Sequence, residues 1–197
     1  MKACDSYPDK ANAVRLRALV LLLRYSGLRI RDAATLSRNR IQGDKLFLYT
    51  AKTGTPVYTV LPDFVVRALE ATPNMTERYY FWTGVGKLCT AVRMWDMRLK
   101  RIFDQAKLAR GHAHRFRDTF AVELLLQGVP MERVAVLLGH QSIKITERHY
   151  APWVRARQEQ LEEDVSRVWS CDPLVLVEGE LQTKGTPKLR EQSTPVN

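Results

Sequence analysis

The segment spanning residues 11–25 constrains the fold of this chain most strongly, because apolar residues recur on nearly every side of the helix it would form. A helix that is apolar all round is a buried helix. The sequence therefore predicts a core helix around which later elements pack. Gly27 is expected to end it, since glycine readily adopts the left-handed conformation that follows many helices.

The remaining pattern predicts an α+β fold that is mainly α-helical. Residues 45–61 are rich in β-branched and aromatic residues and are split by a Lys-Thr-Gly-Thr-Pro run, which indicates a small antiparallel β-hairpin. Residues 79–82 are expected to form a short aromatic strand. Helices are predicted at 31–36, from Pro62, at 87–106, at 114–127, from Pro130, at 142–150 and at 152–169.

Length and composition indicate one globular domain with a tail. The chain has 197 residues, of which 45% are hydrophobic. Its longest apolar run, residues 18–23, is far shorter than the roughly 20 residues that a membrane helix needs. The N-terminus lacks the apolar core of a secretory signal. Three scattered cysteines without C-x-x-C spacing are typical of free thiols. The sequence thus predicts a cytoplasmic protein with no membrane partner.

The net charge of +10 favours a polyanionic partner such as DNA. Residues 171–197 hold three basic and four acidic residues, so this stretch carries −1 and residues 1–170 carry +11. Because residues 171–197 are also rich in Pro, Gly and Thr, they are predicted to be a disordered tail. The predicted helix at 87–106 bears a basic face that is a candidate for nucleic-acid backbone contacts. Its basic residues include Arg93, Arg98, Lys100 and Arg101.

Chemistry-bearing side chains gather between residues 112 and 150. His114 and Arg117 stand three apart on a predicted helix and so share a face. His140 ends a Leu-Leu-Gly-His sequence, and Tyr150 follows ten residues later. Two imidazoles, a guanidinium and a phenol in a basic chain indicate chemistry on a phosphodiester. Because no acidic metal cluster or Gly-rich phosphate loop accompanies them, neither a metal nor a cofactor is expected.

This pattern resembles the catalytic domain of the tyrosine recombinases, or phage-type integrases, over roughly residues 11–169. The matching residues are Arg29 within S-G-L-R-I-R-D, Lys52 on the hairpin, His114 and Arg117 of H-x-x-R, His140 of L-G-H, and Tyr150. Each fragment alone is a weak signal, whereas five in this order are a strong one. The resemblance implies an integrase-type catalytic domain with a small antiparallel sheet.

The resemblance also implies a phosphate clamp. Arg29 and Arg117 would hold the non-bridging oxygens, because guanidinium groups donate bidentately and stay charged. His140 would hydrogen-bond the same phosphate and add electrostatic stabilisation.

The other three residues would move protons and make the covalent bond. Tyr150 would attack as the nucleophile and form a 3′-phosphotyrosyl link that conserves the bond energy for rejoining. His114 would accept the Tyr150 proton, since an imidazole titrates near neutrality. Lys52 would protonate the departing 5′ oxygen.

Each of these residues also has an ordinary structural alternative. Taken alone, Arg29 would be a solvated surface arginine, Lys52 a solubilising turn charge and Tyr150 a structural tyrosine. Lys45 stands near enough in the sequence to compete with Lys52 for the same role. Asp32, three residues after Arg29, either orients that guanidinium or is a favourable charge in the first turn of a helix.

The chain departs from the family pattern in two places. Asp118 stands directly after Arg117, where many relatives have a histidine, and is expected to be a tolerated variant. Family members usually carry a separate helical core-binding domain before the catalytic domain. Here residues 1–170 are predicted to be the catalytic domain, with that N-terminal domain absent.

The expected activity is site-specific DNA recombination or integration through metal-independent cleavage and rejoining of double-stranded DNA. Four protomers would assemble on DNA in the family's scheme, with the helix at 151–169 as the candidate contact between protomers. Three alternatives remain open. Residues 120–140 also fit a non-catalytic helix-turn-helix module. The same active-site residues fit a nicking-closing activity of the type IB topoisomerase kind, or an idle integrase remnant.

Overall fold

A computed structural model of the chain describes residues 1–73 and 76–170. It divides into two units, residues 1–154 and 155–197, and each is described by itself. The predictions for the tail at 171–197 lie outside the described residues. The elements, in chain order, are α1 (Lys2–Asp5), α2 (Lys10–Ser26), α3 (Ile30–Ala34), the 3-10 turn η1 (Arg38–Arg40), β1 (Ile41–Gln42), β2 (Lys45–Tyr49), β3 (Pro56–Val60), α4 (Asp63–Glu70), α5 (Leu88–Gln105), α6 (His114–Leu126), α7 (Met131–Leu137) and α8 (Ile143–Ser170).

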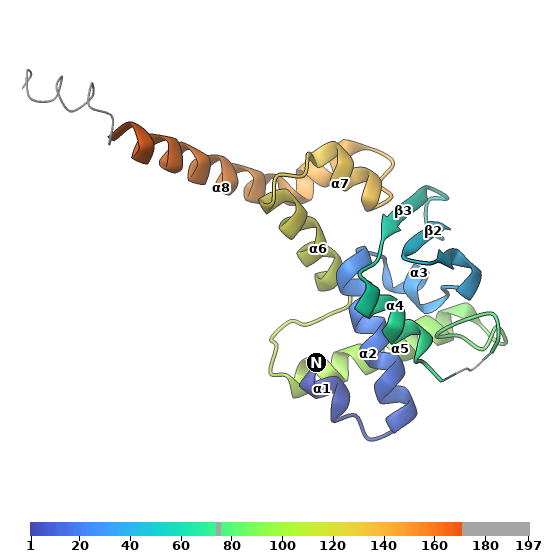
Figure 1. The fold of residues 1–197 in the computed structure, drawn as a ribbon. Helices are drawn as coiled ribbons and strands as arrows, with labels where there is room; N and C mark the ends of the chain where they lie inside the picture. Colours follow the sequence, from blue (N-terminus) through green and yellow to red (C-terminus); the bar gives the residue numbers. More distant parts are fainter. Residues whose placement is uncertain (74–75, 171–197) are drawn as a thin grey trace, which may run out of the picture. The chain divides into compact units, whose positions relative to one another are not determined.

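The predicted core helix is α2, and it lies at the centre of the first unit (Figure 1). Leu16, Leu19, Leu22 and Leu23 on α2 are fully buried. The helix packs against α1, α3, α4, α5 and α6. Gly27 ends it with a φ of +63°, as predicted. Four buried leucines, at roughly 1.5–3 kcal/mol each, make this helix a large contributor to the folding free energy.

A three-stranded antiparallel sheet of order β1-β2-β3 lies beside the helices. Its β2–β3 pair is the predicted hairpin, with Phe47 opposite Tyr58. Side chains alternate along both strands, so that Leu46 and Val57 are buried while Phe47 and Tyr58 are exposed. This alternation is the period of a sheet with one covered face.

A second, smaller core joins α6 and α7 to the start of α8. Ala121, Leu125, Val134, Leu138 and Tyr150 are its buried members. This core anchors the N-terminal part of α8, because Tyr150 is one of the side chains that fill it. The predicted cap at the start of α8 is present, with the Ser142 hydroxyl accepting a hydrogen bond from the Lys144 N–H at 3.3 Å.

Two predictions about elements were wrong. Residues 79–82 form no strand; Tyr79 makes a single bridge to Ser37. The helices predicted at 142–150 and 152–169 are one helix, α8, with Pro152 inside it. Proline removes one backbone donor, yet a helix can continue through it when neighbouring hydrogen bonds remain.

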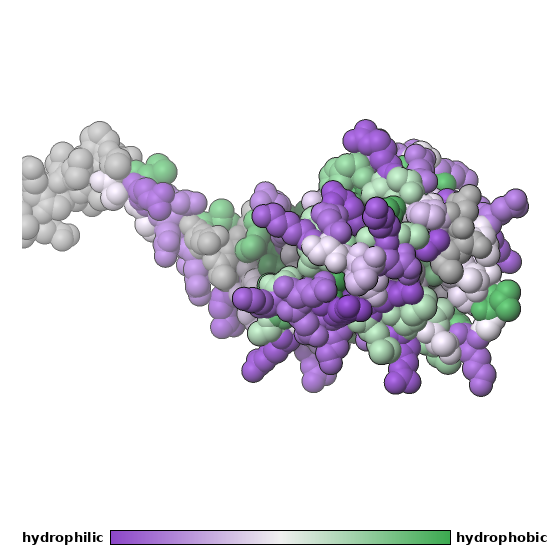
Figure 2. Space-filling view, turned by 90° about the horizontal axis from the view of Figure 1, so that it is seen from below, coloured by the Kyte–Doolittle hydropathy of each residue, from purple (hydrophilic) through white to green (hydrophobic). Residues whose placement is uncertain are grey.

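One face of the molecule is largely hydrophilic (Figure 2). Figure 2 shows polar and charged side chains over most of the face it displays, with smaller hydrophobic areas between them. Within residues 1–73 and 76–170, no helix is long and apolar enough to cross a membrane.

Candidate active site

Arg117 lies in the first turn of α6 and is buried, with 2% of its surface exposed. Its Nη1 donates to the Gly27 carbonyl at 2.7 Å and its Nη2 donates to the Leu138 carbonyl at 2.6 Å. These bonds join the end of α2 to the end of α7. They use two of the five N–H donors of the guanidinium. Burial, followed by repulsion from Arg29, lowers the pKa of Arg117 to about 10, so it remains charged at neutral pH.

Arg29 lies between α2 and α3, in an extended conformation that starts α3. Its Nη1 is buried and has no hydrogen-bond partner among the described residues. A buried donor without an acceptor is costly, typically by about 1–3 kcal/mol. The charge of Arg29 also acts on Arg117. Two neighbouring guanidinium groups, one with an unsatisfied donor, make a favourable place for a doubly ligated anion such as a phosphate.

Asp32 lies in the first turn of α3, which was one of the two alternatives predicted for it. Its buried carboxylate accepts a hydrogen bond from the Ala51 N–H at 2.8 Å. The described partner of Asp32 is therefore the hairpin turn rather than the Arg29 guanidinium. This bond ties the turn that carries Lys52 to the helix that follows Arg29.

The turn around Lys52 is held by three threonines. The Thr50 and Thr53 hydroxyls lie 2.7 Å apart, and the Thr55 hydroxyl donates to Thr53 at 2.9 Å. The Thr55 N–H donates to the Thr50 hydroxyl at 3.1 Å. These hydrogen bonds hold the turn in one conformation. This network was not predicted from the sequence, although three threonines within six residues were a visible signal.

Lys52 is exposed and lines an open cleft of about 510 Å³ together with Arg29, His112 and His114. Lys45 lies at the opposite end of β2, paired with Val60. The sequence could not distinguish between these two lysines. Lys52 is the one that lines the same cleft as Arg29.

His140 follows α7, and its backbone N–H donates to the Ala135 carbonyl at 3.0 Å. Its Nδ1 lies 2.8 Å from the hydroxyl of Thr146, which is fully buried. Burial, followed by the positive charges of Arg117 and Arg29, lowers the pKa of His140 to about 4. The imidazole is therefore neutral at pH 7. With Nδ1 engaged by Thr146, Nε2 is the nitrogen left to face a ligand.

The backbone conformation and the close packing at position 139 explain why a glycine precedes His140. Its φ is +62°, a conformation that favours glycine. A Cβ at this position would lie 2.7 Å from Val57 Cγ2 and 2.9 Å from Thr50 Cγ2. The loop that carries His140 thus rests directly on the hairpin that carries Lys52.

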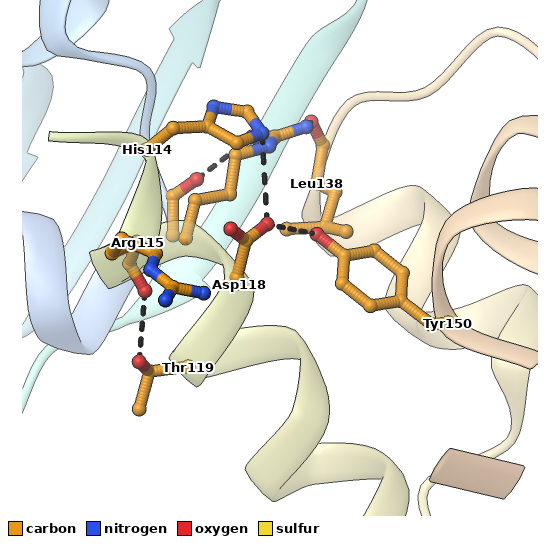
Figure 3. Close-up of polar contacts among 8 residues, drawn as sticks. His114, Arg115, Asp118, Thr119, Leu138 and Tyr150 are labelled. Atoms are coloured by element: carbon orange, nitrogen blue, oxygen red, sulfur yellow. Dashed lines mark hydrogen bonds and ion pairs between the residues drawn. The ribbon is translucent and has the colours of Figure 1, made fainter. Parts of the chain in front are cut away.

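Tyr150 lies on α8 and is 3% exposed. Its hydroxyl donates to Asp118 Oδ1 at 3.1 Å. The same oxygen lies 3.6 Å from His114 Nε2, so the carboxylate stands between the imidazole and the phenol (Figure 3). Burial, followed by the negative charge of Asp118, raises the pKa of Tyr150 to about 12. Asp118, expected to be only a tolerated variant, is the residue that accepts the hydrogen bond of the Tyr150 hydroxyl.

The six predicted residues meet in one region of the first unit. Arg29, His114 and Arg117 all act electrostatically on His140, and Tyr150 acts on Arg117. Lys52 shares its cleft with Arg29 and His114. In the described part of the chain, no group of three or more His, Cys, Asp or Glu side chains is arranged to hold a metal ion.

The site therefore holds a buried phenol close to guanidinium and imidazole groups, on a helical body with a small sheet. Such groups can hold an anionic ester next to a hydroxyl. The chain belongs to the phage integrase family, because the sequence model of that family matches residues 1–154. This confirms the family resemblance seen in the sequence.

Curated relatives are named as recombinases. The chain is 27% identical over 144 residues to the tyrosine recombinase XerC of Rickettsia prowazekii, covering 69% of this chain and 47% of that protein. It is 24% identical over 139 residues to a probable integrase/recombinase of Acholeplasma phage L2, covering 68% and 48%. The chain therefore spans about half the length of these relatives.

Solved structures share the fold. The catalytic domain of bacteriophage HP1 integrase matches with a TM-score of 0.55 at 20% identity, over 82% of this chain and 86% of that one. The XerH recombinase bound to a palindromic difH substrate matches with a TM-score of 0.62 at 20% identity, over 86% and 50%. The predicted fold, mainly helical with a small antiparallel sheet, is confirmed.

Proposed function

We propose that this chain is the catalytic part of a tyrosine-type site-specific recombinase, which cleaves and rejoins double-stranded DNA through a 3′-phosphotyrosyl intermediate. The observation that carries the proposal is the hydroxyl of Tyr150 lying in the same site as two guanidinium groups, Arg29 and Arg117. Family membership supports it, as do relatives named for recombination.

The scissile phosphate would bind where Arg29 and Arg117 meet. The unpartnered Nη1 of Arg29 supplies a donor that requires an acceptor. Arg117 is already held by two carbonyls, so its remaining donors point in a fixed direction. Preorganised donors of this kind stabilise the added negative charge of a phosphorane without reorganising during the reaction. His140, neutral at pH 7, would add a hydrogen bond from Nε2.

Tyr150 would attack the phosphorus and displace the 5′ oxygen, which would take a proton from Lys52. An ammonium on an ordered turn can approach the leaving oxygen without unfolding the hairpin. The hydrogen bond from the Ala51 N–H to Asp32 keeps the turn that carries Lys52 close to Arg29. The phosphodiester energy would be kept in the tyrosyl ester, so rejoining needs no external energy source.

Double-stranded DNA is the proposed partner, in the cytoplasm. The XerH structure is named for its complex with a difH substrate, and a lambda integrase structure for its dimer on a core site. A net charge of +10 suits the same partner.

Self-association on DNA, as a tetramer, is the finer part of the proposal. The described residues of the second unit carry exposed apolar side chains at Leu161, Val165, Val168 and Trp169. Positions 161, 165 and 168 recur at helical spacing and so share one face. Light scattering of the DNA complex, with Val165→Asp as the variant that should lower its mass, would test this contact.

Two of the alternatives can be compared with this proposal. A helix-turn-helix reader would use α6 and α7 for DNA bases, but these helices contribute His114, Arg117 and the support of His140 to the site. A nicking-closing enzyme would share the site and differ in its products. Joining of two different duplexes would favour recombination, whereas relaxation of supercoils alone would favour the topoisomerase-like activity.

The test uses nicked suicide duplexes of pooled random sequence, incubated with the full chain in EDTA. A covalent protein–DNA band on a denaturing gel is expected for the wild type, because loss of the short 5′ fragment traps the tyrosyl ester. Tyr150→Phe should abolish the band. Tyr58→Phe is the matched control, since Tyr58 is exposed on the outer face of the sheet. A band in Tyr150→Phe, or none in the wild type, would contradict the proposal.

A further inference from the structure

Asp118 is the residue in direct contact with the Tyr150 hydroxyl. It lies one helical turn after His114 on α6, and its Oδ1 serves both neighbours (Figure 3). The hydroxyl is 3.1 Å from this oxygen and His114 Nε2 is 3.6 Å from it. About a third of the Asp118 side chain is exposed, so the carboxylate sits at the edge of the buried phenol.

This geometry separates His114 from Tyr150. The described hydrogen bond of the phenol is to Asp118 Oδ1, and the imidazole approaches the same oxygen from the other direction. A group that takes a proton must lie within hydrogen-bond reach of it, or one water away. We infer that Asp118 receives the proton of Tyr150 during attack on DNA, and that His114 positions the Asp118 carboxylate. This inference rests on the proposed function.

The proton balance of the step is simple. The Tyr150 oxygen bonds to phosphorus while the bond from phosphorus to the 5′ oxygen breaks. The phenol proton moves to Asp118 Oδ1, and the 5′ oxygen takes a proton from Lys52. Rejoining reverses both transfers, so that Asp118 returns its proton to the departing Tyr150 oxygen.

The timing of the transfer follows from the acidity of the groups. A phenol does not give its proton to a carboxylate at rest, and here burial and the charge of Asp118 raise the pKa of Tyr150 further. Arg117 and Arg29 oppose this shift. As the oxygen bonds to phosphorus its proton becomes strongly acidic. The proton is therefore transferred in the transition state. General base catalysis typically raises the rate of such a step by roughly 10²–10⁴-fold.

His114 takes a different part from the one the resemblance implied. Burial lowers its pKa, although the charge of Asp118 opposes this, so the imidazole is neutral at pH 7. The neutral ring lies against Asp118, with Nε2 3.6 Å from Oδ1. It thereby holds the carboxylate in the direction of Tyr150 without competing for the phenol proton.

The test compares Asp118→Asn with wild type in single-turnover formation of the covalent complex. Asparagine keeps the size and a hydrogen-bond acceptor but cannot hold the proton. The rate should fall by about 100-fold or more. It should also rise with pH more steeply than in wild type, because hydroxide must then replace the carboxylate. Asp118→His should recover part of the rate, since an imidazole can accept a proton. DNA binding and melting temperature serve as controls and should stay unchanged in Asp118→Asn.

A second comparison separates the two residues. His114→Gln should slow the reaction less than Asp118→Asn, and the double variant should be no slower than Asp118→Asn alone, because His114 acts through Asp118. A wild-type rate in Asp118→Asn would overturn this inference and leave the proposed function intact. So would a lower rate with an unchanged pH profile, which marks a purely structural role. No adduct in the wild type would overturn both.

Discussion

His140 shows how the charge state of one residue is set by its neighbours. It sits between the Thr146 hydroxyl, 2.8 Å away, and two guanidinium groups. A charged imidazole there would face two positive charges in a partly dehydrated site. The neutral form is consequently favoured, and it can donate to a phosphate without adding a third charge.

This residue should make folding stability depend on pH. Its pKa is about 4 in the folded chain against 6.5 for the free group, so the unfolded chain binds the proton more readily. Stability contributed by neutral His140 is complete above pH 6.5 and is lost as the pH falls toward 4. Urea unfolding at pH 7.5 and pH 5 should show the wild type losing about 1–2 kcal/mol more than His140→Asn. An equal loss in both would contradict the assignment.

Not every residue contact of the site could be predicted from the sequence. His114 and Asp118 are four apart on a helix, so their pairing was predictable. The bond from Tyr150 to Asp118 spans 32 residues and depends on how α8 packs on α6. The bond from Asp32 to Ala51 likewise depends on the docking of the hairpin. Motif spacing identified the residues that share the candidate site, whereas the contacts that hold them depend on the fold.

At the scale of elements, the hairpin and the loop after α7 support each other. Gly139 brings the loop against Val57 and Thr50 with no room for a Cβ. The hairpin was predictable because its pattern is local. The conformation of residues 79–82 and the continuity of α8 could not be predicted from local sequence. A strand needs a partner strand, and a helix through Pro152 needs neighbouring turns to hold it.

Substitution at two glycines should reveal this contact. Gly139 and Gly43 have nearly the same φ, +62° and +60°, but a Cβ at Gly43 would meet nothing within 4 Å. Gly43→Ala should cost only backbone strain, about 1–2 kcal/mol. Gly139→Ala should cost about 2–4 kcal/mol, because overpacking adds to the strain. Urea denaturation measures both, and equal losses would show that the loop does not rest on the hairpin.

For the whole molecule, positive charge should govern DNA binding. A second cleft, of about 700 Å³, includes Arg93 and Lys87 and shares Ile30, Arg31 and Asp96 with the cleft that Lys52 lines. Arg93 and Lys87 thus extend a path of basic side chains from the Lys52 cleft away from the candidate site. Phosphate contacts along such a path release counterions when DNA binds.

Binding measured by fluorescence anisotropy should therefore weaken steeply with salt, by at least about tenfold between roughly 50 and 200 mM. Arg93→Ala should reduce the slope of log K against log salt by about 0.9, the effect of one phosphate contact. Arg67→Ala removes the same charge from an ion pair with Asp63 on α4 and should leave the slope unchanged. A flat salt response would count against a footprint dominated by the DNA backbone.

The two hydrogen bonds that Arg117 donates to backbone carbonyls affect which mutations an inactive copy of the gene can accumulate. The same side chain joins the ends of α2 and α7 and is proposed to hold the phosphate. A mutation at this codon would remove the proposed activity and loosen the fold together. A lineage could exchange Tyr150 for phenylalanine, which keeps the buried ring in the second core, and retain a stable protein, but it could not lose Arg117 on the same terms. Inactive descendants that persist as repressors or decoys should therefore retain the arginine long after the tyrosine has gone.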